Sequence, residues 1–509
     1  MAKNKGGVEA RFISFGRFIF RNRLKTILAV AVLIAGLASQ LPKIVIDTST
    51  EGFFIEGDPA IVAFESFREQ FGREDVVIVA VRPPKVFEAG FLRKLKKLHD
   101  ALEEGVPHMK EVTSLINARQ TRGEGDELIV EDLLEEIPAT AAEMADLRRR
   151  VLASPLYANF FISEDGGFTA LVVEIEAYSS GQEAGDDDLA GFEEEATGPA
   201  PAAEPKTLLS DREIAGVVAA VEKIAAGFEG PDFEIFIAGT PVWTTFLLNA
   251  LPRDMGRFMA LAVLAIGTFL FLLFRRVAGV VLPLLIVILS LMGTIGLMAA
   301  TGTALSSPTS ILPSFLLAVG VGASVHLLAI FLGHYAKHHD KEEGIAYALG
   351  HSGLPILMTG LTTAAGLFSF VPADLAPVRD LGLFGGLGVL LSLAITLVLL
   401  PALIAVWPFR PNPLGGAKAD GGGMERLLKG IADFSTGHPW GVVIVSTLII
   451  AVVGAGLPAL VFSHQPIRWI PESQKLRISV RVIDQELKGS SGLEVVVDSG
   501  EENGLYDPA

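Results

Sequence analysis

The chain has 509 residues, of which 50% are hydrophobic, and its mean hydropathy of +0.48 is too high for an ordinary soluble protein. Charged residues still make up 19%, so a membrane part must be accompanied by a sizeable aqueous part. The chain has no cysteine, which excludes disulfides, thiolate metal sites and thiol nucleophiles, and its net charge of −17 argues against nucleic acid as a partner.

The amino terminus has the charge pattern that precedes a first membrane span. Residues 1–25 carry the basic residues Lys3, Lys5, Arg11, Arg17, Arg21, Arg23 and Lys25, and residues 26–42 are free of charge. Basic flanks stay in the cytoplasm, so we expect a cytoplasmic segment over 1–25 and a first span over 26–42. A cleaved signal peptide is the alternative, but no small-residue cleavage site follows.

Residues 43–250 predict an external α+β domain. Strand patterns occur at 73–81, 110–115 and 233–238, and helical patterns occur at 87–102, 131–152 and 211–228. Residues 158–163 and 168–176 flank Glu164-Asp165-Gly166-Gly167, which predicts a hairpin. This order of elements favours a ferredoxin-like domain built from split βαβ units.

One segment of this domain differs in composition from the rest. Residues 179–205 contain acidic residues, Gly, Ala and Pro but no Lys or Arg, which predicts a disordered loop. A cation site is the alternative, although the spacing of a calcium loop is missing.

Residues 256–407 predict five closely spaced spans, at 258–274, 277–300, 311–333, 353–371 and 381–407, each free of Asp, Glu, Lys and Arg. Residues 408–438 are a basic connector that we place in the cytoplasm, and residues 440–462 predict a seventh span. Residues 463–509 would then begin a second external domain. Both soluble segments would lie outside the cell membrane.

The span at 311–333 carries polar residues near its middle, Ser324 and His326. Helical spacing aligns Gly320 with Ser324 and Gly322 with His326, so a small-residue face runs beside a polar edge. One interpretation is structural, with the Ser324 hydroxyl bonded to the Gly320 carbonyl and His326 bonded to a neighbouring helix. The other is that both residues line a proton or ion path.

The beginning and the end of the chain resemble each other. Leu41-Pro42 recurs as Leu457-Pro458, the segment 55–58 recurs at 470–473, and the strand pattern at 75–81 recurs at 493–497. Internal repeats are common in transporters. We therefore expect the amino-terminal part of a longer repeated protein, with the remainder of its second half missing and the first helix of that half starting at about 505–509. A natural protein with a frayed tail is the alternative.

This order of spans and domains resembles the resistance-nodulation-division (RND) superfamily, in particular its lipid-exporting branch of MMPL-like and hopanoid-exporter-like proteins. The most specific motifs are Gly239-Thr240-Pro241-Val242 and the run from Gly320 to His326. Relatives often have a proton-carrying Asp where this chain has Ala323, which puts proton coupling through this half in doubt. The five spans also resemble a sterol-sensing domain.

The resemblance implies a multi-pass protein of the bacterial inner membrane that exports a hydrophobic molecule or lipid, with no cofactor beyond a proton-motive force. Periplasmic partner proteins and a homo-oligomer are compatible with it. The alternative is a lipid sensor or a protein-export accessory on the same scaffold. An enzyme is not expected, because no catalytic motif occurs. His334, His338 and His339 suggest either a metal site or, beside Lys337 and Lys341, a solvated helix end.

Overall fold

The computed structural model describes residues 2–47, 51–55, 57–71, 76–124, 127–134, 136–176, 209–409, 423–461 and 465–490. The chain divides into two compact units. The first, here called the membrane unit, comprises residues 1–61 and 250–464, and the second, here called the α+β unit, comprises residues 62–249 and 465–509. The expected loop at 179–205, the strand at 493–497 and the helix start at 505–509 lie outside the described residues.

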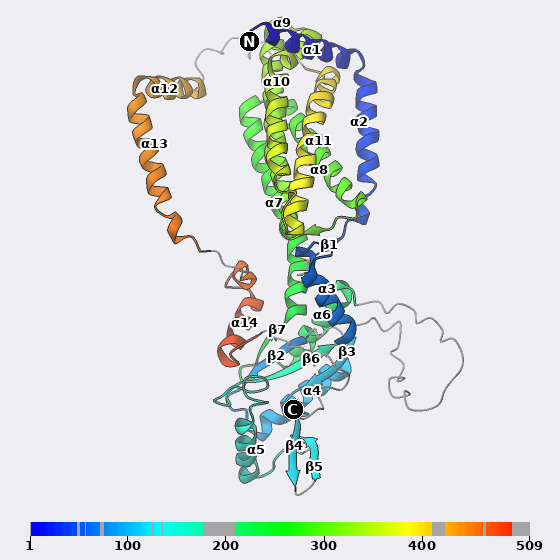
Figure 1. The fold of residues 1–509 in the computed structure, drawn as a ribbon, viewed down its shortest axis with the longest axis vertical. Helices are drawn as coiled ribbons and strands as arrows, with labels where there is room; N and C mark the ends of the chain where they lie inside the picture. Colours follow the sequence, from blue (N-terminus) through cyan, green and yellow to red (C-terminus); the bar gives the residue numbers. More distant parts are fainter. Residues whose placement is uncertain are drawn as a thin grey trace, which may run out of the picture. The chain divides into compact units, whose positions relative to one another are not determined.

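The α+β unit is built on an antiparallel sheet of four strands, β2 (Val76–Arg82), β3 (Met109–Thr113), β6 (Thr169–Ile175) and β7 (Glu234–Ala238), in the order β3-β6-β2-β7. Helix α4 (Ala89–Gly105) follows the first strand and α6 (Asp211–Phe228) follows the third, so the chain order is β-α-β-β-α-β (Figure 1). The alternation of β2 buries Val77, Val79 and Val81 in one core with apolar residues of α4 and α6.

Local sequence signals explain where the helices of this unit begin. α6 starts at the predicted residue because Ser210 and Glu213 form a capping box, and α5 (Ala141–Ala153) starts with the same motif from Thr140 and Glu143. Each box satisfies backbone N–H groups that the first helical turn leaves without partners.

Two features of this unit differ from the sequence prediction. The hairpin of β4 (Arg119–Glu124) and β5 (Glu127–Asp132) was not predicted, because its strands lack apolar alternation. The hairpin predicted at 158–176 forms next to its turn, where Ile162 pairs with Thr169 in antiparallel fashion and the Ser163 N–H donates to the Phe168 carbonyl at 2.9 Å, but the rest of its first arm is not a strand. Before this pairing the chain turns, because the Phe161 and Ile162 N–H groups both donate to the Tyr157 carbonyl, and the apolar side chains of the turn are buried in the core.

Helix α14 (Lys475–Glu486) covers the other face of the sheet. Val482, Ile483 and Leu487 pack in one cluster with Phe168 and Phe236. The Ile237 backbone N–H on the edge strand β7 donates to the Ser479 hydroxyl at 3.2 Å. Arg82 of β2 also reaches Glu486 at 2.8 Å. A helix from a distant part of the chain therefore covers this face of the sheet, since Ser479 lies 242 positions after Ile237.

The membrane unit contains long apolar helices, α2 (Arg23–Ala38), α7 (Thr240–Phe274, from residue 250 onward), α8 (Val277–Ala300), α9 (Leu312–His338), α10 (Lys341–Phe368), α11 (Ala376–Val406) and α13 (Pro439–Gly454). Among the described residues, six helical segments are long and apolar enough to cross a membrane. The expected count was seven, and α10 is the helix that falls short. Its first turn is charged, and Ser352, Pro355 and several Thr and Gly residues dilute its apolar part.

Helix α11 is the centre of this unit and packs against α2, α8, α9 and α10. Helix α1 (Ala2–Arg21) lies along α10, where a Cβ on Gly16 would come within 3.1 Å of Ala346 (Figure 1). The short strands β1 (Ile46–Asp47) and β8 (Leu305–Ser306) pair in parallel and tie the end of α2 to the loop before η4 (Thr309–Ile311) and α9. The amino-terminal segment is thus an integral part of the bundle.

The expected internal repeat recurs at the level of helices. Three pairs of elements begin 416 positions apart in the chain. The pairs are α2 and α13, then η1 (Leu41–Lys43) and η5 (Leu457–Ala459), and finally α3 (Pro59–Phe71) and α14. η2 (Glu51–Phe53) and η6 (Pro466–Trp469) occupy the intervening position, and α1 and α12 (Gly423–Gly437) precede the two spans. The segment that follows each of the two spans therefore contains helices in both copies.

We expect Gly239→Ala to destabilise the α+β unit. Gly239 has φ of +123°, which L-residues rarely adopt, and a Cβ there would collide with the Val76 carbonyl oxygen. A loss of roughly 1–3 kcal/mol is expected, as for other strained backbone positions, and thermal unfolding of the purified protein measures it. Gly227→Ala on α6, where a Cβ meets open space, is the matched control and should be neutral or stabilising. Equal melting temperatures for both variants would contradict this account.

Candidate functional site

A cavity of about 320 Å³ lies between α9, α10 and α11 of the membrane unit. Its walls are mainly apolar. The lining residues are Leu316, Val319, Gly320, Gly322, Ala323 and His326 of α9, Pro355, Ile356, Thr359, Gly360 and Thr363 of α10, and Val389, Ser392 and Leu393 of α11. The small-residue motif of α9 thus forms one wall of the cavity.

The two glycines of this motif have different surroundings. A Cβ on Gly320 would lie 2.7 Å from the Ser392 hydroxyl and 3.0 Å from a methyl group of Val287, so α9 is in close contact with α8 and α11 there. A Cβ on Gly322 would meet nothing within 4 Å. Gly320 therefore allows α9 to approach α8 and α11 closely, whereas the space beside Gly322 is open at the cavity.

Ser324 and His326 are separated by the fold. Ser324 is fully buried on the side facing α11, and its hydroxyl lies 3.3 Å from the equally buried Thr396 hydroxyl. The expected bond from Ser324 to the Gly320 carbonyl is therefore replaced by a contact between two helices. Ser324 does not line the cavity.

His326 is an exposed residue of the membrane unit and is the ionisable side chain on the cavity wall. It makes no hydrogen bond or ion pair with the residues that the structure describes. The bond from His326 to a neighbouring helix therefore stays a prediction. Its imidazole remains available to a molecule that enters the cavity.

The sequence reasoning missed the hydroxyl groups that α10 and α11 bring to this cavity. Thr359 and Thr363 each bond to the carbonyl four residues earlier, at 2.9 and 2.8 Å, and Ser392 faces Gly320 across the helix contact. The i, i+4 spacing of Thr359 with Thr363, and of Ser392 with Thr396, is a sequence signal that could have found them.

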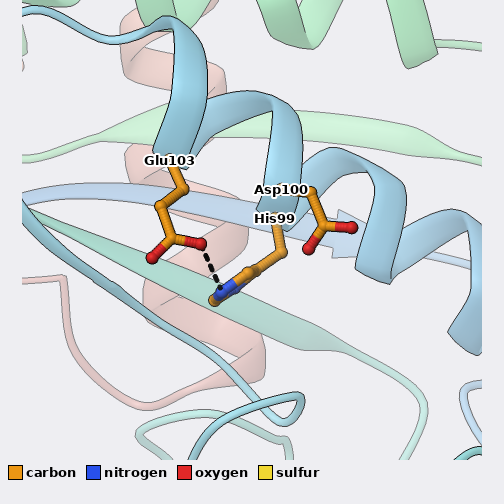
Figure 2. A group of neighbouring side chains, drawn as sticks. All are labelled: His99, Asp100 and Glu103. Atoms are coloured by element: carbon orange, nitrogen blue, oxygen red, sulfur yellow. Dashed lines mark ion pairs between the residues drawn. The ribbon is translucent and has the colours of Figure 1, made fainter.

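A group of potential metal ligands lies on α4 of the α+β unit. His99, Asp100 and Glu103 bring their potential metal ligands within 4.8 Å of one another. Figure 2 shows the His99 ring turned toward Glu103, at 3.9 Å, while the other ring nitrogen lies 3.0 Å from the Ser114 hydroxyl. Burial lowers the pKa of His99, with a smaller opposing effect from Glu103, so the ring is held in its neutral form. These contacts explain His99 as a buried structural residue.

The helical bundle, its candidate spans and its apolar cavity define a polytopic membrane protein with an aqueous α+β unit. Residues 200–419 match the MMPL family. This match confirms the resemblance to MMPL-like proteins of the RND superfamily, and it covers the end of the α+β unit and the helices that form the cavity.

Three relatives illustrate the likeness. A membrane protein of Methanocaldococcus jannaschii is 26% identical over 35% of this chain and 45% of its own. The hopanoid transporter HpnN of Burkholderia multivorans is 31% identical over 33% of this chain and 18% of its own. Membrane protein YdfJ of Bacillus subtilis is 24% identical over 70% of this chain and 44% of its own. The chain therefore spans less than half the length of these relatives.

We expect Gly320→Ala to destabilise the bundle by roughly 1–3 kcal/mol, because the added methyl group overlaps Ser392 and Val287 in a packed contact. Gly322→Ala, two residues further along α9, adds the same methyl group in open space and should leave the melting temperature nearly unchanged. Thermal unfolding in one lipid or detergent system compares the two. A larger loss for Gly322→Ala would show that the helix contact has been assigned to the wrong glycine.

We expect His99 to make the α+β unit less stable in mild acid. Its folded-state pKa lies below the unfolded value of about 6.5, so its contribution is complete above that pH and is lost as the pH falls through the folded pKa. His99→Gln should reduce the difference in unfolding free energy between pH 7.5 and 5.5. An unchanged pH dependence in this variant would rule out His99 as the cause.

Proposed function

We propose that this chain provides the membrane machinery of an RND-type transporter that moves a hydrophobic molecule, a lipid, out of the inner membrane toward the periplasm or outer membrane. The observation that carries the proposal is the apolar cavity between α9, α10 and α11. Its volume of about 320 Å³ falls within the usual range of small-molecule sites. Within the MMPL family match, such a cavity is a natural binding site for part of a lipid.

The chemistry of the lining supports a lipid as cargo. Apolar walls favour rings or acyl chains, and His326 with the hydroxyls of Thr359 and Thr363 can hold a polar head. One relative is named a hopanoid transporter, which makes a polycyclic lipid the first cargo to test.

We propose that the α+β unit is a ferredoxin-like domain in the periplasm. The strand order β3-β6-β2-β7 and the chain order β-α-β-β-α-β support this fold. The basic residues of 1–25 and of the connector at 408–438 support a cytoplasmic position for those segments, and therefore an outside position for residues 43–250.

We propose that proton coupling in this half does not use the position of Ala323, whose methyl group cannot titrate. His326 is the ionisable candidate on the cavity wall, with Ser324 limited to the contact with Thr396. The small residues Gly320, Gly322 and Ala323 shape the wall. His326 could serve either a proton or a polar head group.

A second candidate function is favoured by Ala323, which cannot titrate. A lipid sensor or a protein-export accessory would need the cavity but no titrating residue at this position. In a deletion strain, accumulation of a lipid in the inner membrane supports the transporter, whereas a secretion defect with unchanged lipids supports the accessory.

The cavity itself is tested by filling it. Thr359→Trp should place an indole in the cavity and reduce lipid export at least tenfold in the complemented deletion strain, measured as lipid remaining in the inner membrane by mass spectrometry. Met358→Trp is the matched control, because Met358 is the neighbour of Thr359 in the chain, is exposed and does not line the cavity. Normal export by a stably expressed Thr359→Trp variant would exclude the cavity as the transport site.

A further inference from the structure

The cavity between α9, α10 and α11 has an exposed mouth and a buried floor. At the mouth, Gly322 and His326 of α9 and Thr359 of α10 are exposed residues. The deeper lining consists of residues that the bundle buries, which are Leu316, Gly320, Ile356, Val389, Ser392 and Leu393. The floor is therefore apolar apart from a single side chain, that of Ser392.

Ser392 is a buried hydroxyl without a partner. The residue is 4% exposed, and its Oγ atom makes no hydrogen bond with the residues that the structure describes. Other buried hydroxyls of the bundle donate to the carbonyl four residues earlier, as Ser290 does at 2.7 Å, Thr294 at 2.8 Å and Ser352 at 2.6 Å. Because an unsatisfied buried polar group costs free energy, this exception needs an explanation.

The Ser392 oxygen is directed at the α9 wall of the cavity. It lies 2.7 Å from the position that a Cβ of Gly320 would take, and Gly320 belongs to that wall. Since Gly320 has no side chain, none covers the oxygen from that residue. A polar group placed in this way on an apolar lining is what fixes the orientation of a ligand in small-molecule sites.

The lining also determines which charge a ligand can carry. Among the described residues it contains no Asp, Glu, Lys or Arg, and its ionisable side chain, His326, lies at the exposed mouth. Moving an ionised carboxylate or phosphate to the floor would cost more than a single hydroxyl can return. The floor therefore suits an uncharged group.

A single hydroxyl on the floor suits a ligand with one small polar end. The serine hydroxyl donates one hydrogen bond and accepts others, and an alcohol complements it in both roles. A hydrocarbon end would leave Ser392 unsatisfied. A larger head, such as a sugar, would bring more polar groups than the apolar floor can satisfy.

The alternative place for a polar head is the mouth. Thr359 and Thr363 use their O–H groups to donate to backbone carbonyls, so they can only accept from a ligand. Both are less buried than Ser392. A buried hydroxyl discriminates more strongly, because a ligand that lacks the matching group leaves it unpaired away from water.

We propose that Ser392 is the head-group subsite of the cavity and that its ligand is an uncharged lipid ending in a hydroxyl group. This hydroxyl hydrogen-bonds to the Ser392 Oγ atom, while the apolar body of the lipid extends between α9, α10 and α11 toward the mouth. That the bound alcohol is also the cargo rests on the proposed transport function, whereas binding at Ser392 does not.

Equilibrium binding to the purified full chain in detergent tests this subsite without transport. The probes are radiolabelled dodecanol, dodecanoate and dodecane, which share one chain length and differ only in the end group. In mildly alkaline buffer, where the carboxylic acid is ionised, the wild type should bind dodecanol roughly tenfold more tightly than dodecanoate, or more. This comparison needs no variant.

Ser392→Ala removes the hydroxyl without adding volume. It should weaken dodecanol binding roughly two- to tenfold, which is the value of one neutral hydrogen bond, and leave dodecane binding unchanged. Ser290→Ala is the matched control, because the Ser290 hydroxyl is buried, is bonded to the Ile286 carbonyl and does not line the cavity. This control should bind both probes as the wild type does.

Three results would overturn the proposal. In the first, Ser392→Ala binds dodecanol with the wild-type affinity while Thr359→Val weakens it, which would place the head at the mouth. In the second, dodecanoate binds as tightly as dodecanol. In the third, Ser392→Ala loses dodecane and dodecanol binding equally, so that Ser392 acts by packing alone. A confirmed subsite together with a deletion strain that accumulates no lipid would instead refute the proposed transport function alone.

Discussion

Close approach of helices at glycine is the constraint on which the membrane unit depends. Lipid chains are as apolar as leucine, so helices in a membrane associate through tight packing rather than through the hydrophobic effect. A Cβ on Gly296 would collide with the Leu37 carbonyl oxygen, and one on Gly388 would come within 2.8 Å of Leu316. The same rule creates the cavity, because α9 touches α11 at Gly320 and no side chain fills the space beside Gly322.

Local patterns predicted most elements because their causes are local. The helix at 211–228 was correct to the residue, since Ser210 and Glu213 cap it, and β2 followed from a run of apolar residues. The β4–β5 hairpin was missed because β4 contains no apolar residue, so the strand shows no apolar alternation. The position of α14 could not be predicted, because it depends on contacts between residues 242 apart, such as Ile237 and Ser479.

The candidate site was predicted only in part, because local spacing shows how residues lie on one helix but not which residues of other helices contact them. Helical spacing placed Gly320, Ser324 and His326 on adjoining edges of one helix, and this is geometry that one segment determines. It could not tell which neighbour faces each edge. The Ser324 hydroxyl contacts the Thr396 hydroxyl of α11, whereas His326 lines the cavity together with residues of α10. The stacking of the His334 ring on Tyr347 of α10 likewise depends on a neighbouring helix, which no spacing within α9 reveals.

The internal repeat has a physical consequence for the α+β unit. α14 is the counterpart of α3 in the second copy, yet it packs on the sheet formed by the first copy. The helices α4 and α6 cover one face of that sheet, and Phe168 and Phe236 on the other face are buried with Ile483 of α14. Residues 43–250 alone would expose this apolar face and leave the Ile237 N–H of the edge strand without its partner. The two copies are therefore joined by packing as well as by the chain, because a helix of the second completes the core of the first.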